Sequence, residues 1–199
     1  VMDESRHLEV FRKRALANGG GLMRMIDSVS DVVGGSTDGA REYTELSTRL
    51  HIVGEGNVLT LFRLGELMAY NEAEKTIYRR CAQDEARHVA IGVLHARYMQ
   101  ECSPERIEEM HSYLDEAENR QSSGAGGENP AARNMLTSEA LAVMLGGGKD
   151  KADEGQKILM AVRQKQVKEY FQRLKSAGLD ERITNGRVNP ALLEAYQAA

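Results

Sequence analysis

The chain carries one five-residue pattern twice, and this repeat constrains its fold more than any other feature. Residues 3–7 read DESRH and residues 84–88 read DEARH, and both copies lie in stretches with helical periodicity. In each copy a Glu and a His stand three positions apart. Such residues project from the same side of a helix, about one turn from each other. Two helices packed together could therefore bring two Glu/His pairs to one place.

The rest of the chain also favours helices. Strand-like alternation of β-branched residues is almost absent, and the chain has only three prolines. We expect helices over the ranges 1–18, 22–33, 40–70, 72–102, 103–120, 130–145 and 152–177, a flexible loop over 122–130, and a short helix after Pro190. The predicted fold class is all-α. A four-helix-bundle core occupies 1–103, and the helices of 104–199 pack on the same domain.

Composition excludes several classes of function. The net charge is −4 and no basic block occurs, which argues against nucleic-acid binding. No apolar run reaches the ~18 residues that a membrane span requires, and the chain does not open with a signal-peptide pattern. Cys81 and Cys102 do not form a disulfide framework, so we expect buried thiols in a reducing compartment, the cytoplasm.

Three acidic or basic side chains are expected to face inward. At 100° per residue, Glu85 and His88 fall among the apolar residues of the 72–102 helix. Glu55 lies on an apolar stripe of the 40–70 helix, between Gly54 and Gly56, which cost ~1 kcal/mol each in a helix and so indicate close packing or room for a ligand. The charged residues of that helix are expected on its narrow remaining face: Glu42, Glu45, Arg49 and Arg63.

Converging buried carboxylates need a positive partner. Two of them ~4 Å apart repel by ~4 kcal/mol at an effective dielectric of 20, and divalent ions remove this conflict. Glu-x-x-His pairs on two helices, with single carboxylates from two others, form the ligand plan of dimetal carboxylate bundles. Here the pairs are Glu4/His7 and Glu85/His88, and Glu55 is the natural single carboxylate. Mixed oxygen and nitrogen ligands suit Fe or Mn.

The doubled Asp-Glu-x-Arg-His pattern, together with Glu55, resembles the ferritin-like superfamily of O2-activating di-iron proteins over residues 1 to about 100. The resemblance implies a ferritin-like bundle, two Fe ions (or Mn), O2 as co-substrate, an electron donor and a small or apolar organic substrate. It implies a non-haem di-iron oxidase or oxygenase, such as a monooxygenase. A homodimer is also expected. The implied metal ligands are Glu4, His7, Glu55, Glu85 and His88, with Glu55 and Glu85 acting in catalysis. The residues implied to orient the histidines are Asp3, Arg6, Asp84 and Arg87.

The sequence departs from that family at three points. The family's first ligand is a Glu on a helix before the first box, so we expect that this helix is missing before Val1. The radical-forming Tyr of ribonucleotide reductase small subunits is replaced by Phe11, which argues against a tyrosyl radical of that type. Gly92, one turn after His88, is expected to leave open space and to line a substrate pocket with Phe11 and Cys81.

Other interpretations of the same residues stay open. The whole chain could be a ferroxidase or iron-handling protein, or a non-catalytic helical subunit with an incomplete site. The boxes could form surface ion pairs, and Glu66 competes with Glu55 for the single-carboxylate role. His51 and His95 are expected to be core histidines rather than ligands. The acidic segment 105–118 is expected to form a solvated helix face.

Overall fold

The structure is a computed structural model that describes residues 2–21, 40–123, 139 and 141–197. Every regular element within this part of the chain is a helix, which confirms the all-α prediction there. The named elements are α1 (Met2–Ala17), α3 (Tyr43–Ser47), η1 (Thr48–Gly54), α4 (Glu55–Met68), α5 (Glu72–Cys102), η2 (Pro104–Arg106), α6 (Ile107–Ser123), η3 (Lys149–Lys151), α8 (Ala152–Ser176), α9 (Glu181–Thr184) and α10 (Pro190–Gln197). The predicted helix over 22–33, the predicted loop from 124 onward and the start of the predicted 130–145 helix lie outside the described residues. The first two residues of the predicted 122–130 loop belong instead to α6, which ends at Ser123.

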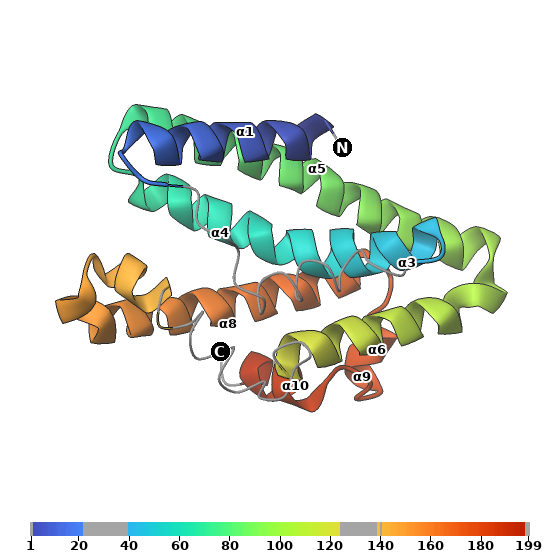
Figure 1. Cartoon of the computed structure of the whole chain (residues 1–199). Coiled ribbons are helices and arrows are strands. Elements are labelled where there is room, and N and C mark those ends of the chain that lie inside the picture. Colours follow the sequence, from blue (N-terminus) through green and yellow to red (C-terminus); the bar gives the residue numbers. More distant parts are fainter. Residues whose placement is uncertain (1, 22–39, 124–138, 140, 198–199) are drawn as a thin grey trace.

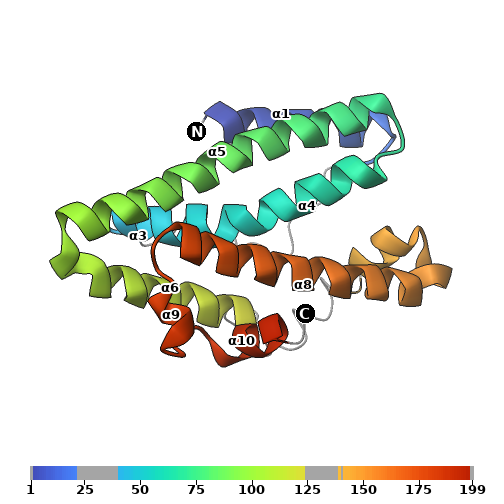
Figure 2. The ribbon, with the colours of Figure 1, turned by 180° about the vertical axis from the view of Figure 1, so that it is seen from behind.

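The helices form layers (Figures 1 and 2). α1 lies antiparallel along the first half of α5, and α4 pairs with α5 as an antiparallel hairpin. The turn of this hairpin is closed by Asn71, whose side chain accepts a hydrogen bond from the Glu74 amide at 2.9 Å, as expected of a helix N-cap. On the other side of the α3–η1–α4 segment lie α6 and α8, and α9 and α10 pack beyond them. The α3–η1–α4 segment is therefore the middle layer of the fold.

The helix expected over 40–70 has a π-helical segment, η1, between α3 and α4. A π-helical turn contains an extra residue, so it rotates the side chains before it relative to those after it. Glu45 and Arg49, predicted to lie on the narrow face between the apolar stripes, are both buried, because α6 covers this side of the segment. Arg49 pairs with Glu45 at 2.7 Å and with Glu116 of α6.

One apolar core joins the two predicted halves of the chain. Ile52 of η1 and Ala96 of α5 pack in the same cluster as Leu114 of α6 and Phe171 of α8, and all four are almost fully buried. Phe171 also stacks on Tyr196 of α10, with ring centroids 4.1 Å apart. Burial of a large apolar side chain contributes ~1.5–3 kcal/mol. The C-terminal helices thus help to fix the middle layer.

The predicted solvated face over 105–118 is wrong at its C-terminal end. Glu118 is 1% exposed and Asp115 is half-buried, because both meet Arg182 of α9. Glu108 and Glu109 are exposed, as expected. Among the described helices none is long and apolar enough to cross a membrane.

Candidate metal centre

The two Asp-Glu-x-Arg-His boxes face each other where α1 packs against α5. Nε2 of His7 lies 3.1 Å from Oδ2 of Asp84, and Nε2 of His88 lies 3.2 Å from Oδ2 of Asp3. Each histidine is therefore held by the aspartate of the other box. This exchange requires two antiparallel helices in register, which explains why the whole pattern occurs twice.

Hydrogen bonds from histidines and arginines favour the ionised form of the two aspartates. Partial desolvation would raise the pKa of Asp3, but the hydrogen bond from His88 and then the charges of Arg6 and Arg87 lower it. Arg6 donates to Asp3 at 2.6 Å and to Asp84 at 2.7 Å, and Arg87 donates to Asp84. Burial alone would raise the pKa of Asp84, but hydrogen bonds from Arg6, His7 and Arg87 outweigh it and lower that pKa to about 2. An ionised carboxylate only accepts hydrogen bonds, so each histidine donates from Nε2 to its aspartate, which leaves Nδ1 as the nitrogen that could bind a metal ion.

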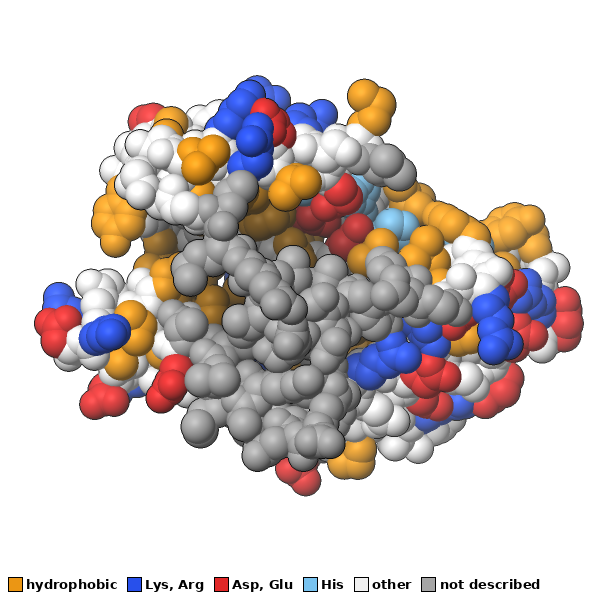
Figure 3. All heavy atoms as spheres, in the orientation of Figure 1, with side chains coloured by type: hydrophobic (Ala, Val, Ile, Leu, Met, Phe, Trp, Pro, Cys, Tyr) orange, Lys and Arg blue, Asp and Glu red, His pale blue; other side chains and the backbone are white. Residues whose placement is uncertain are grey.

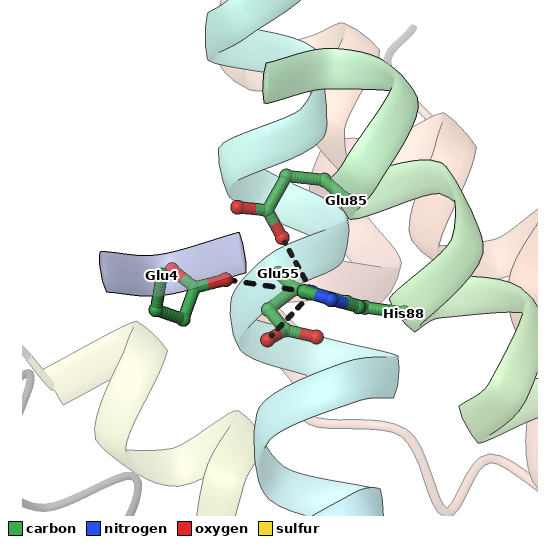
Figure 4. A group of neighbouring side chains, drawn as sticks. All are labelled: Glu4, Glu55, Glu85 and His88. Atoms are coloured by element: carbon green, nitrogen blue, oxygen red, sulfur yellow. Dashed lines mark ion pairs between the residues drawn. The ribbon is translucent and has the colours of Figure 1, made fainter. Parts of the chain in front are cut away.

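Those Nδ1 atoms point at glutamates. His7 Nδ1 lies 3.4 Å from Glu4 Oε2 and 3.4 Å from Glu85 Oε1. His88 Nδ1 lies 3.6 Å from Glu4 Oε1, 3.5 Å from Glu85 Oε2 and 3.4 Å from Glu55 Oε1. Figure 4 shows the three glutamates, from α1, α4 and α5, converging on His88. Glu4 and Glu85 thus each present one oxygen to each histidine, as a carboxylate that bridges two ions would.

We call Glu4, His7, Glu55, Glu85 and His88 the carboxylate–histidine cluster. One ligand atom from each of Glu4, Glu55, Glu85 and His88 lies within 4.8 Å of the others. Buried His7 Nδ1, His88 Nδ1 and Glu85 Oε2 have no hydrogen-bond partner among the described residues. Leaving such atoms unpaired costs ~1–3 kcal/mol each. A bound cation would satisfy all three, so the residues fit the metal ions that the sequence implied.

The electrostatics of the cluster also favour a cation. Burial, followed by the charges of Glu4 and Glu55, raises the pKa of Glu85 to about 7. A divalent ion favours the ionised form and so reverses this effect. The side chain of Glu4 is 53% exposed. Figure 3 shows acidic and histidine side chains gathered at the surface beside α1. Ions can therefore reach the cluster from this side.

Of the two glutamates that competed for the single-carboxylate role, the structure brings Glu55 to the cluster. Glu66 lies three turns further along α4 and pairs with Arg79 at 2.7 Å. Glu55 directly follows η1, and its Oε2 lies 2.5 Å from His51 Nδ1. His95 bonds to Thr44 Oγ1 at 3.0 Å, which agrees with its prediction as a core histidine.

The open space expected beside Gly92 is filled. A Cβ atom at Gly92 would lie 2.7 Å from the Cβ of His51 and 3.2 Å from Ile52 Cγ1. The pocket-lining prediction for Gly92 is therefore wrong, because η1 packs directly on α5 at this position. Cys81 is buried one turn before Glu85, and burial raises the pKa of its thiol to about 11, so it stays protonated.

Phe11 lies in an aromatic group beside the cluster. Its ring stacks on Phe62 at 5.6 Å and lies 5.5 Å from Tyr78. The edge of Phe62 meets His7, with ring centroids 5.9 Å apart. Sequence reasoning missed this role of Phe62, although its position two turns after Glu55 on the same helix was an available signal.

Sequence reasoning also missed Arg173 of α8. This buried side chain donates from Nε to the Ile52 carbonyl at 2.9 Å and from Nη1 to the Gly56 carbonyl at 3.4 Å. A Cβ at Gly56 would lie 2.3 Å from Arg173 Cζ. Gly56 therefore allows close packing of Arg173 on α4. Close packing was one of the two explanations that the presence of glycine within this helix suggested.

Comparison with known proteins gives no relative: no protein-family model, no curated protein and no solved structure matches the chain. The geometry of the cluster and the motifs that form it therefore carry the functional argument.

Proposed function

We propose that the chain binds two iron ions, or manganese, in the carboxylate–histidine cluster and uses O2 to oxidise a small or apolar organic substrate. It would be a non-haem di-iron oxidoreductase of the ferritin-like type. The observation that carries this proposal is the position of Glu4 and Glu85, each with one oxygen beside Nδ1 of His7 and one beside Nδ1 of His88.

The cluster divides naturally between two ions. His7 would hold one ion and His88 the other, with Glu4 and Glu85 shared and Glu55 at the ion beside His88. A pair of Fe(II) ions supplies electrons for the reduction of O2, which is the chemistry that such centres contribute. Four helices provide ligands in the dimetal plan, and α1, α4 and α5 would supply three of them.

The chain's own residues would prepare the centre. Asp3 and Asp84 hold the proton of each histidine on Nε2 and so leave Nδ1 free for metal. Phe11 and Phe62 cover the His7 side with aromatic carbon, which excludes water there and offers an apolar surface to a substrate.

A second candidate function is iron oxidation without an organic substrate. The 53% exposure of the Glu4 side chain favours it, because iron could enter and leave directly from solvent. The two functions differ in what limits turnover. A ferroxidase would consume O2 in proportion to added Fe(II), whereas an oxygenase would consume it in proportion to substrate and reductant.

Anaerobic loading with Fe(II), followed by elemental analysis, tests the proposal. We expect about two ions per chain in the wild type, and fewer in H7A and in H88A. The matched control is H95A, which removes a histidine of α5 that bonds to Thr44 instead of the cluster. Admission of O2 should then produce colour in the wild type and in H95A. Near-zero metal in the wild type, or equal metal in wild type and H88A, would contradict the proposal.

A further inference from the structure

The two carboxylate oxygens of Glu55 have different partners. Oε1 lies 3.4 Å from His88 Nδ1 and faces the cluster, whereas Oε2 lies 2.5 Å from Nδ1 of His51. Of the three glutamates of the cluster, Glu55 is the one that pairs with His51 among the described residues. The His51 ring lies near that of His88, with centroids 5.9 Å apart, and its side chain is mostly buried. A third histidine therefore pairs with Glu55 through the oxygen that does not pair with His88.

We propose that His51 is a positioning residue that restricts Glu55 to a single metal-binding oxygen. This inference rests on the proposed metal site. A carboxylate that binds a metal ion is ionised and only accepts hydrogen bonds, so in the metal-bound site His51 would donate from Nδ1–H to Oε2. With Oε2 held toward His51 in this way, Oε1 is the oxygen that faces the ion beside His88. The hydrogen bond would thus set how many coordination positions of that ion Glu55 fills.

The packing around His51 keeps it in this place. Gly92 of α5 lets the backbone of η1 approach, since any Cβ there would collide with the Cβ of His51. From the opposite side Arg173 binds the carbonyls of Ile52 and Gly56, which lie on either side of Glu55 in the sequence. The segment from His51 to Gly56 is therefore clamped between α5 and α8.

The helix type of this segment supports the same conclusion. η1 is π-helical over Thr48–Gly54 and returns to α-helix at Glu55. Hydrogen bonds of a π turn span five residues, a rare arrangement that occurs frequently at functional sites. Arg173 donates to the carbonyl of Ile52 within this turn. The π-helical segment is thus held by a buried arginine from another layer, and it ends at Glu55, the carboxylate that pairs with His51.

The test compares H51N with H51L in the full chain, with Co(II) as the probe. An Asn side chain places its amide nitrogen about where Nδ1 stands, so H51N keeps a donor to Oε2, whereas H51L removes it. The visible absorption of bound Co(II) reports its coordination number independently of any activity. Competition with a chromogenic chelator gives the affinity. H95L is the matched control, because His95 lies on α5 and bonds to Thr44.

We expect H51L to change the Co(II) absorption and to weaken binding of one ion by roughly 10- to 100-fold, the usual effect of losing a partner of a metal ligand. H51N should restore the wild-type spectrum and most of the affinity, and H95L should match the wild type. A wild-type spectrum and affinity in H51L would overturn the positioning role, as would equal defects in H51N and H51L. Loss of a whole ion in both variants would make His51 a ligand and overturn it too.

The outcomes also separate this inference from the proposed function. If the wild type binds no Co(II), and no Fe(II) either, then the metal site itself fails, and the role of His51 fails with it. If the wild type binds two ions and H51L is indistinguishable from it, only the role of His51 fails.

Discussion

Two buried glutamates show how differently this fold treats the same side chain. Glu118 of α6 is 1% exposed and fully bonded. Its Oε1 accepts hydrogen bonds from the Tyr170 hydroxyl and, at 3.0 Å, from Arg182, and its Oε2 accepts from the Asn189 amide at 2.7 Å. Arg182 binds Asp115 as well, at 2.7 Å. The network is complete within the chain, apart from one N–H of Arg182, at Nε.

Glu85 of α5 is 2% exposed but lacks such partners. Within the part of the chain that the structure describes, its Oε2 has no hydrogen-bond partner, and neither do the nearby Nδ1 atoms of His7 and His88. The polar atoms around Glu118 form hydrogen bonds with one another, which is typical of a structural role. In the carboxylate–histidine cluster, by contrast, potential metal-ligand atoms have no partner among the described residues, as expected of a site that binds a ligand from outside the chain. Burial alone therefore does not mark a site, whereas converging unpaired ligand atoms do.

The largest expected effect contrasts the two glutamates directly. In metal-free protein E118Q should lower the free energy of unfolding by about 3 kcal/mol, because removing one partner of a buried ion pair leaves Arg182 poorly compensated. E85Q should cost less than about 0.5 kcal/mol at pH 8, or stabilise, because it removes a buried charge that lies beside the carboxylates of Glu4 and Glu55. Urea denaturation in EDTA measures both. Equal losses in the two variants would remove the distinction between the regions.

The second effect concerns metal. A metal that binds only the folded chain should add about 2.7 kcal/mol to the free energy of unfolding at 100 times its Kd. Mn(II), which O2 oxidises less readily than Fe(II), is a convenient probe in urea denaturation. E118Q should keep this gain despite its lower starting stability, because its network lies apart from the cluster. H88A should lose much of it. An unchanged gain in H88A would place the bound metal elsewhere.

The sequence was sufficient for the parts of the fold that local patterns determine. The Glu-x-x-His spacing places each pair on one helix face, and the apolar stripe of α5 predicts that Glu85 faces inward. Those two facts put each Glu/His pair on one inward-facing side of its helix, so the pairs can meet once the two helices pack together. The predicted ranges 1–18, 72–102 and 152–177 also agree with α1, α5 and α8 to within a residue or two at each end.

Long-range contacts decided what the sequence could not predict. Glu45 and Arg49 are buried because α6 covers their side of the segment, a contact that the 40–70 pattern alone could not reveal. The Ile52 carbonyl of η1 accepts a hydrogen bond from Arg173, more than a hundred residues away. The sequence places Glu118 among the solvated acids of 105–118, because the chain pattern does not show that Arg182 of α9 packs against it. Gly92 leaves room, as expected, but the backbone of η1 fills that room instead of a substrate.

The third effect is the pH dependence of the metal-free protein. The pKa of Glu85 is about 7 in the folded chain, against an ordinary 4.5. Between these values the folded state keeps a proton that the unfolded state has lost, so this group's contribution to stability falls as pH rises from 5 to 8. We expect a loss of about 2–3 kcal/mol, since each pKa unit corresponds to ~1.4 kcal/mol.

E85Q isolates that contribution. Burial lowers the pKa of His95 and of His111, which are thereby more stable as neutral groups, so they make the folded state gain stability as pH rises. These opposing slopes are common to wild type and E85Q and cancel when the two are compared. Urea denaturation in EDTA at pH 5.5 and pH 8 should show that the advantage of wild type over E85Q shrinks, or reverses, at the higher pH. A constant difference would mean that Glu85 is ionised throughout and that the cluster tolerates its charges without metal.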